Sequence, residues 1–383
     1  VFASLKRAPE SLQARIAAIP GIVEVETRVV AGVNLEVAGF TEPITGRLIS
    51  IPDTREPRLN RLYLRQGRLT AADRNDEVIV SEAFAEAHRL EPGAKLRVVI
   101  NGRRQALTIV GTALSPEYIH QMRPGSIFPD YRRYGVLWMG RRALGVAYGM
   151  EGAFNDVVMG LANAHAAPKV IDELDRLLTP YGGLGAHDRE DQSSHRFMTE
   201  EFRQITLSAT LFPTIFLGVA VFLLNVVISR LIGMQREQIG TLKAFGYGNG
   251  AVALHYLKLV LLIVLVGVAV GIGIGAWLGQ LLAALYMDFF RFPFLDYRLT
   301  LPLVLGALLL NLGAAVAGTA FALRAAFALR PAEAMRPEPP ARYRATVVER
   351  LGLQKWLSQP NRMILRHIER RPFKSLLTVL GIA

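Results

Sequence analysis

The sequence predicts a membrane protein in which an α+β extracytoplasmic domain is followed by a bundle of membrane-spanning α-helices. Of the 383 residues, 51% are hydrophobic, and the long apolar runs lie in the second half of the chain. Charge divides in the same way, because residues 1–204 carry 26 basic and 25 acidic side chains, whereas residues 205–383 carry 18 and 7. The first half is typical of a soluble domain, and the second of membrane spans joined by basic loops.

Residues 1–204 combine helix and strand signals. An amphipathic run from Ser11 stops at Pro20-Gly21, which predicts a short helix. Asn101-Gly102 lies between two apolar runs and predicts a tight hairpin. Pro168 is well placed to begin a helix that reaches Leu178. The strands we expect are residues 22–30, 33–37, 48–51, 77–80, 96–100, 105–110 and 156–161.

Three apolar runs are long enough to cross a membrane, at residues 205–229, 259–287 and 301–323. Basic residues predominate in the loop between the first two runs and in the stretch from Arg324 to Lys374, so the positive-inside rule places both in the cytosol. The loop at residues 288–300 has two bases and two acids and is predicted to lie outside. The domain before the first span is therefore extracytoplasmic.

The C-terminal part continues beyond these three spans. Residues 331–372 are predicted to be a cytosolic, proline-containing linker and a basic amphipathic helix. Residues 373–383 are apolar and predict the start of a further span. As a helix they would cover about 16 Å of a hydrocarbon core of about 30 Å, so we expect that span to be truncated.

Several kinds of chemistry have no sequence signal. The chain has no cysteine, which excludes disulfides and thiolate catalysis. It contains no GxxxxGK[ST], GxSxG or HExxH motif, so no catalytic residue is predicted. Residues 187–195 hold two histidines and three acids, but their spacing matches no metal motif, and we expect no metal. The basic side chains flank membrane spans, which argues against nucleic-acid binding.

Two patterns in the second half have a predicted role. Glycines recur every fourth residue in the second span and would lie on one helical face, which predicts tight packing against another helix. They are Gly267, Gly271, Gly275 and Gly279. The polar stretch REQIGTLKAFGY (236–247) predicts a short helix with an apolar edge at Ile239, Leu242 and Phe245, ended by Gly246. This pattern fits both an interfacial anchor and a helix that docks on a cytosolic partner.

The sequence resembles the FtsX-like, MacB/LolC-type ABC transporter permeases. REQIGTLKAFG (236–246) is similar to the family pattern R-x-x-E-I-G-x-L-[KR]-A-[LIM]-G, although Gln238 replaces the usual Glu and the acid lies one position earlier, at Glu237. RAAFALRPAEAMRPE (324–338) resembles the end of the family's transmembrane domain. Residues 361–383 resemble the start of another permease unit, and residues 77–111 resemble the core of the MacB-type periplasmic domain.

The resemblance implies a MacB-like periplasmic domain at residues 1–204 and an FtsX-like permease domain at residues 205–330. The chain would be a multi-pass protein of the bacterial inner membrane and part of a duplicated permease. ATP and Mg would bind to a separate ATPase subunit, so the chain itself is expected to be no enzyme and to hold no cofactor. The residues implied to couple to that ATPase are Arg236, Glu237, Ile239, Gly240, Leu242, Lys243, Phe245 and Gly246.

The function implied is that of a permease subunit that couples ATP hydrolysis by its partner to export, or to extracytoplasmic movement, of a lipid, lipoprotein or peptide. Membrane lipids, and a periplasmic adaptor or second permease unit, are the other expected partners. The alternative is a mechanotransmission regulator that activates an extracytoplasmic enzyme without transport.

Overall fold

The chain divides into two units, each with its own core. The computed structural model describes residues 1–123, 125–126, 128–327 and 358–359. One unit comprises residues 1–205 and 280–297, and the other comprises residues 206–279 and the residues from 298 onward. The predicted linker and amphipathic helix at 331–372, and the predicted truncated span at 373–383, lie outside the described residues apart from 358–359.

The first unit is an α+β structure, as predicted. Its strands are β1 (Phe2–Pro9), β2 (Ile22–Arg28), β3 (Val30–Glu36), β4 (Ile44–Ile51), β5 (Tyr63–Gly67), β6 (Glu77–Ser81), β7 (Lys95–Ile100), β8 (Arg103–Leu114), β9 (Tyr134–Gly140), β10 (Ala153–Leu161) and β11 (Ala186–His187). Its shorter helices are α1 (Leu12–Ala17), α2 (Glu82–His88), α3 (Arg141–Ala147), α4 (Ala167–Leu178) and the 3₁₀ turns η1 (Ala164–Ala166) and η2 (Thr179–Tyr181).

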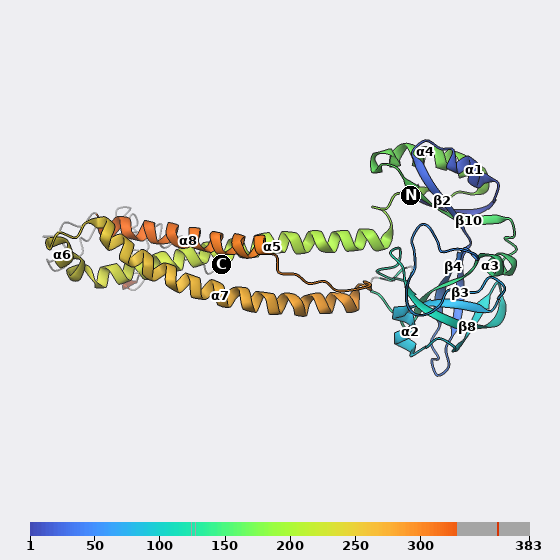
Figure 1. Ribbon diagram of the computed structural model, residues 1–383, viewed down its shortest axis with the longest axis horizontal. Helices are drawn as coiled ribbons and strands as arrows, with labels where there is room; N and C mark the ends of the chain where they lie inside the picture. Colours follow the sequence, from blue (N-terminus) through green and yellow to red (C-terminus); the bar gives the residue numbers. More distant parts are fainter. Residues whose placement is uncertain (124, 127, 328–357, 360–383) are drawn as a thin grey trace. The chain divides into compact units, whose positions relative to one another are not determined.

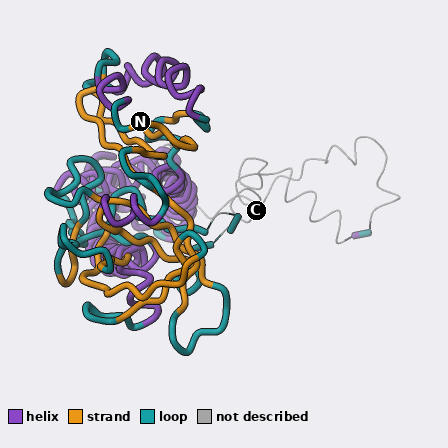
Figure 2. Tube along the Cα trace, turned by 90° about the vertical axis from the view of Figure 1, so that its right-hand side faces the viewer, coloured by secondary structure: helices purple, strands orange, loops and turns teal. Residues whose placement is uncertain are grey.

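Residues 1–28 and 153–187 form what we call the ferredoxin-like lobe. Its sheet has the order β11-β1-β10-β2, with every neighbouring pair antiparallel. Helices α1 and α4 cover one face of this sheet (Figures 1 and 2). The chain order β1-α1-β2 and β10-α4-β11 is the split βαβ arrangement of ferredoxin-like folds. The rest of the first domain is inserted between β2 and β10.

The insertion, residues 30–147, forms what we call the barrel lobe. Its strands follow the order β5-β8-β6-β9-β4-β3-β7, and β7 also pairs with β8, which closes six strands into a barrel. Strand β8 has 12 residues, so its first half pairs with β7 and its second half with β6 and β5. All six barrel strands contribute to one buried apolar cluster. The barrel therefore has a packed interior.

The structure confirms some of the local predictions and corrects others. The hairpin predicted at Asn101-Gly102 is confirmed, with φ of +47° and +74° at the two residues, as a type I′ turn requires. The single strand predicted for residues 22–30 is wrong, because the chain leaves the ferredoxin-like sheet after Arg28 and joins the barrel at Val30. Strands β1, β5, β9 and β11 and helices α2 and α3 were not predicted. Strand β9 shows one reason. All seven of its residues are buried, so it lacks the alternation that marks a half-exposed strand.

A buried ion-pair cluster joins the two lobes. Arg28 of β2 lies 2.6 Å from both Glu117, in the loop after β8, and Asp156 of β10. Asn60 donates a further hydrogen bond of 2.8 Å to Glu117. Burial alone would raise the pKa of Glu117, but the charge and hydrogen bonds of Arg28, together with Arg47 and Asn60, outweigh it, and the pKa lies below its ordinary value. The carboxylate is therefore ionised at neutral pH.

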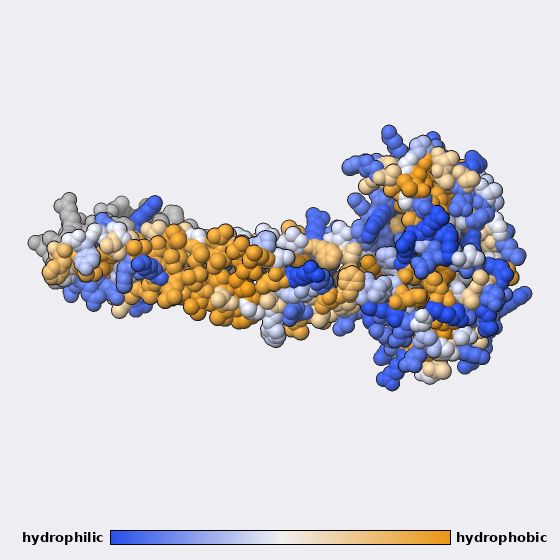
Figure 3. All heavy atoms as spheres, in the orientation of Figure 1, coloured by the Kyte–Doolittle hydropathy of each residue, from blue (hydrophilic) through white to orange (hydrophobic). Residues whose placement is uncertain are grey.

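The second unit is helical. Its helices are α5 (Ser193–Met234), α6 (Arg236–Ala244), α7 (Asn249–Phe289) and α8 (Leu301–Phe327), and α5 and α7 each have one end in the first unit. Helices α5, α7 and α8 are long and apolar enough to cross a membrane, and Figure 3 shows apolar side chains along them. With 42 and 41 residues, α5 and α7 would each measure about 60 Å, twice the hydrocarbon thickness.

The long helices change the division of the chain that we predicted. Helices α5 and α7 run beyond the predicted spans 205–229 and 259–287 at both ends. The last turns of α7 and the loop after it, residues 280–297, belong to the same unit as residues 1–205. A domain ending at residue 204 therefore leaves out a segment that contributes to its structure.

The four helices of the second unit share one buried cluster. It consists of Ile228 and Ile232 of α5, Ile239 of α6, Val252, Tyr256 and Val260 of α7, and Ala315, Ala322 and Leu323 of α8. A close helix contact lies at Gly318 of α8, where an added Cβ would be 3.2 Å from the carbonyl oxygen of Val221 in α5. A small residue is needed there for the backbones to approach.

Three of the four glycines on the predicted face of α7 have no close neighbour among the described residues. A Cβ added at Gly267, Gly271 or Gly275 would meet no heavy atom within 4 Å, and Gly279 is half-buried. Tight packing of this face stays a prediction, and any helix that packs on it lies outside the described residues of this chain.

Replacing Glu117 with Gln should lower the thermal midpoint of the full chain in detergent by about 6–12 °C. Arg28 would keep its buried charge with only Asp156 to match it, a loss of about 3 kcal/mol, and each kcal/mol shifts the midpoint by about 2–4 °C in a domain of this size. The matched control is Glu24→Gln, which removes a more exposed ion pair with Arg58 worth at most about 1 kcal/mol.

The stability difference between the parent and Glu117→Gln should depend on pH. The pKa of Glu117 in the folded state is below 4.5, so its ion pair contributes fully above pH 4.5 and is lost as pH falls through the folded-state value. The difference between the parent and Glu117→Gln should therefore shrink in acid. Equal midpoints at neutral pH would contradict the assigned role of this ion pair.

Replacing Gly318 with Leu should destabilise the helical unit by about 1–3 kcal/mol, because the side chain would force α8 away from α5. Gly275→Leu is the matched control, since that position opens onto free space. The measurement is the thermal midpoint of each variant in the same detergent. Equal loss in both would show that the Gly318 contact is not specific.

Candidate coupling site

Helix α6 forms a short, separate segment between two membrane-length helices. Helix α5 ends at Met234, Gln235 alone interrupts the helical backbone, and α6 begins at Arg236. The next long helix, α7, starts at Asn249. The coupling residues predicted from the sequence, within 236–246, therefore lie in one helix and its C-terminal turn.

One side of α6 is anchored in the helical bundle. Ile239 is 4% exposed and belongs to the buried cluster of α5, α7 and α8, and Gly240 beside it is also buried. At the start of α6, the hydroxyl of Tyr256 donates a hydrogen bond of 2.5 Å to Oε1 of Gln235. The backbone N–H of Ile239 bonds to the carbonyl of Gln235 at 3.0 Å. These contacts connect the root of α6 to the first turns of α7.

The other side of α6 is exposed. Phe245 is 79% exposed and Leu242 is 42% exposed, and Tyr247 just beyond them is also exposed. The apolar edge that the spacing predicted is thus divided, because Ile239 turns into the bundle while Leu242 and Phe245 face outward. A helix only nine residues long must anchor one face in order to be held at all.

The C-terminal turn of α6 has a defined geometry. Gly246 has a φ of +95°, its N–H bonds to the carbonyl of Lys243, and the N–H of Tyr247 bonds to the carbonyl of Leu242. This is a Schellman motif, which favours glycine because the position is left-handed. The prediction that Gly246 ends the helix is confirmed. The turn fixes the position of Phe245 in the connection between α5 and α7.

Two charged residues of α6, Glu237 and Lys243, suit the ends at which they lie, whereas Arg236 at the first position does not. Glu237 is exposed in the first turn, and Lys243 lies in the last, so each charge complements the helix dipole. Thr241 donates a hydrogen bond to the carbonyl of Glu237. The displaced acid of the sequence motif is therefore at the surface of the same helix.

Sequence reasoning missed the contacts that hold α6 in place. The bond between Tyr256 and Gln235 joins residues 21 positions apart, and neither residue stands out in the motif. The close approach at Gly318 was missed as well, although the run GAAVAG (313–318) is rich in small residues and would have signalled it.

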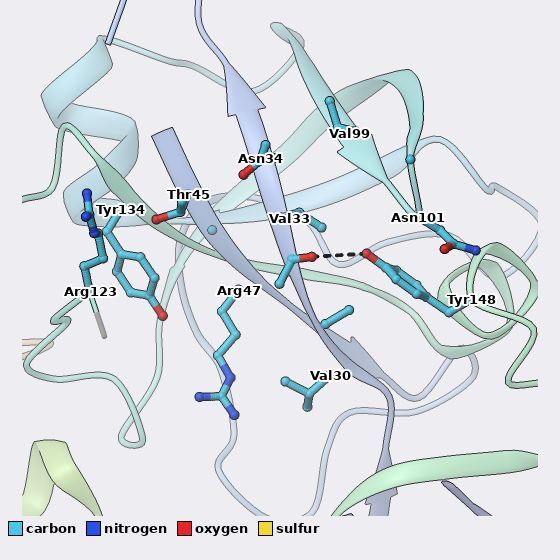
Figure 4. A pocket seen from close by; sticks show the side chains of 14 residues that line it. Val30, Val33, Asn34, Thr45, Arg47, Val99, Asn101, Arg123, Tyr134 and Tyr148 are labelled. Atoms are coloured by element: carbon cyan, nitrogen blue, oxygen red, sulfur yellow. Dashed lines mark hydrogen bonds between the residues drawn. The ribbon is translucent and has the colours of Figure 1, made fainter. Parts of the chain in front are cut away.

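The barrel lobe contains an open hollow of about 750 Å³ beside β3 and β4 (Figure 4). Asn34, Arg47 and Tyr134 are among its lining residues, and Tyr148 donates a hydrogen bond of 3.3 Å to the carbonyl of Gly32. The pKa of Arg47 is raised by the nearby Tyr118 and by Asp156 and Glu117, so carboxylates of the Arg28 cluster already offset its charge. No group of three or more metal-ligating side chains occurs within the described part of the chain.

Comparison with known proteins assigns the helical part of the chain. Residues 210–331 match the family model described as FtsX-like permease C-terminal. No match was found among curated proteins. Among solved structures, the extracellular domain of the noncanonic ABC-type transporter YknZ from Gram-positive bacteria is 13% identical with a TM-score of 0.34, covering 49% of this chain and 100% of that one.

A second similar structure is the periplasmic region of MacB from Actinobacillus actinomycetemcomitans, also 13% identical, with a TM-score of 0.33. The match covers 53% of this chain and 91% of the MacB chain. The match to residues 210–331 includes α6, α7, α8 and most of α5. This stretch of the chain is therefore similar to the C-terminal domain of FtsX-like permeases.

Proposed function

We propose that this chain is the permease subunit of an ABC transporter and that α6 docks on a separate ATPase subunit. The observation that carries the proposal is the two-sided character of α6, which is rooted in the bundle through Ile239 while Leu242 and Phe245 face outward. A docking helix needs both properties, since it must fill a partner's groove and pass the partner's movement to the helices behind it.

The partner proposed here would supply the ATP chemistry. The sequence contains no P-loop of its own, so ATP and Mg would be bound by the ATPase subunit. The positive-inside rule places α6 in the cytosol, where ATP is available. The exposed Glu237, with Arg236 and Lys243 on the same helix, would meet charged groups at the rim of the ATPase groove.

The proposed activity is ATP-driven export, or extracytoplasmic movement, of a lipid, lipoprotein or peptide across or out of the bacterial inner membrane. Helices α5 and α7 are each continuous through about 40 residues and reach from the permease domain into the first unit. Such helices suit mechanical transmission, in which movement at α6 reaches the extracytoplasmic domain. A periplasmic adaptor or a second permease unit would complete the assembly.

The regulatory alternative uses the same docking step. In that case the movement would activate an extracytoplasmic enzyme and no cargo would move. Reconstituted vesicles that hold the permease and its ATPase distinguish the two, because transport predicts release of a labelled lipid, lipoprotein or peptide that depends on ATP. Enzyme activation without release would assign the chain to the regulatory class.

Replacing Leu242 and Phe245 together with Asp should reduce association with the proposed ATPase subunit by at least about tenfold. Each exposed side chain would lose its contact in an apolar groove, and anchor residues of this kind each contribute more than about 1 kcal/mol. The measurement is a pull-down of the ATPase on the full chain in detergent, with the amount of membrane-inserted permease quantified.

The matched control for this experiment is the pair Phe294→Asp and Leu295→Asp, which are also exposed but lie in the loop predicted to be outside. Ile239→Asp provides a contrast, because it should reduce the amount of folded permease rather than docking alone. Full retention of the ATPase by the Leu242 and Phe245 variant would rule out the docking assignment.

A further inference from the structure

The loop after β8 contacts the ends of two long helices. Gln192, just before α5, donates from Nε2 to the carbonyl of Glu117 at 2.7 Å, and its Oε1 caps α5 by accepting from the N–H of His195. The backbone N–H of His120 bonds to Oγ of Ser194 at 2.9 Å. The first turn of α5 is therefore bonded to this loop at two points. We call residues 117–121 the link segment.

The end of α7 is bonded to the same segment. The N–H of Arg291, two residues past α7, bonds to the carbonyl of Ile119 at 3.1 Å. Nearby residues of the barrel lobe support this contact, because Tyr131 donates to the carbonyl of Phe289 at 3.0 Å and Glu86 pairs with Arg291 at 2.6 Å. All these residues belong to the first unit.

The ring of His120 lies between the two helices. It stacks on Phe197 of α5 with ring centroids 4.1 Å apart and an interplanar angle of 4°, and Phe290 and Phe289 lie at 5.5 and 5.9 Å. His120 is 3% exposed, and neither ring nitrogen has a hydrogen-bond partner among the described residues. Burial lowers its pKa, so the ring is neutral at pH 7 and acts as an apolar plate.

The first residue of the link segment reaches the other lobe. The side chain of Glu117 accepts two hydrogen bonds from Arg28, at 2.6 and 3.1 Å, and Arg28 is in turn paired with Asp156. Arg28 and Asp156 belong to β2 and β10, the two strands of the ferredoxin-like lobe that flank the inserted barrel. The backbone of the segment thus binds the helix ends, and its side chain binds the seam between the lobes.

We propose that the link segment mechanically couples the ends of α5 and α7 to the seam between the ferredoxin-like and barrel lobes. The segment spans only five residues, and its Glu117 and His120 side chains are buried, so a displacement of either helix end strains the Arg28 cluster directly. This inference rests on the proposed function, because the coupling would serve to pass movement of the permease helices to both lobes. Glu117 and His120 are positioning residues in it.

The test is hydrogen exchange of the full chain in lipid nanodiscs, without an ATPase. His120→Ala should raise exchange at β2 and β10 by about tenfold relative to β6 of the barrel core, although His120 touches neither strand. Reciprocally, Glu117→Gln should raise exchange at residues 193–201 and 286–292, although its carboxylate contacts neither helix. Exchange in β6 serves as the internal standard for general destabilisation.

Three variants complete the test. His120→Phe keeps the stacked ring and should behave like the parent, whereas Ser194→Ala removes one hydrogen bond outside both lobe cores and should reproduce the effect on β2 and β10 in weaker form. Glu24→Gln is the control for loss of an ion pair elsewhere on β2. The proposal would be overturned if His120→Ala and Ser194→Ala raised hydrogen exchange only at the helix ends and Glu117→Gln raised it only at β2 and β10. The result is independent of whether α6 binds an ATPase.

Discussion

The buried charge of Arg28 is the constraint on which the first unit depends. A guanidinium at this depth must be matched by carboxylates, and the two that match it come from distant parts of the chain, Glu117 after β8 and Asp156 on β10. Because the barrel lobe is inserted between β2 and β10, these pairs fix the insertion to its host lobe. Glu117, the first residue of the link segment, belongs to this cluster.

The two faces of α6 also have different roles. Ile239 and the bond between Tyr256 and Gln235 hold one face in the bundle, which leaves Leu242 and Phe245 outward-facing on a helix too short to be stable alone. An interfacial anchor would direct its apolar residues to one side. The structure directs them to two, and this separation favours docking over the membrane-anchor interpretation that the sequence pattern left open.

Local features could be predicted from the sequence, whereas long-range pairings could not. The hairpin at Asn101-Gly102 and the helix end at Gly246 follow from backbone conformations that few residues adopt. Burial of Ile239 depends on side chains from three other helices, and the ferredoxin-like sheet, which is interrupted by the inserted barrel, depends on strand pairs such as β1 with β10, about 150 residues apart. Spacing alone carries no signal for such contacts, which is also why residues 280–297 were not assigned to the first unit.

The two proposed elements lie at opposite ends of the same helices, and this gives the long helices a physical purpose. Helix α5 begins beside the link segment and ends next to α6. Helix α7 begins after α6 and ends beside the link segment. A span needs only about 20 residues to cross a bilayer, yet these helices have 42 and 41. The additional turns carry the contacts of Phe197 and Phe289 with His120. Two continuous helices bonded to one short segment can pass on a displacement that independent, flexibly linked spans would lose.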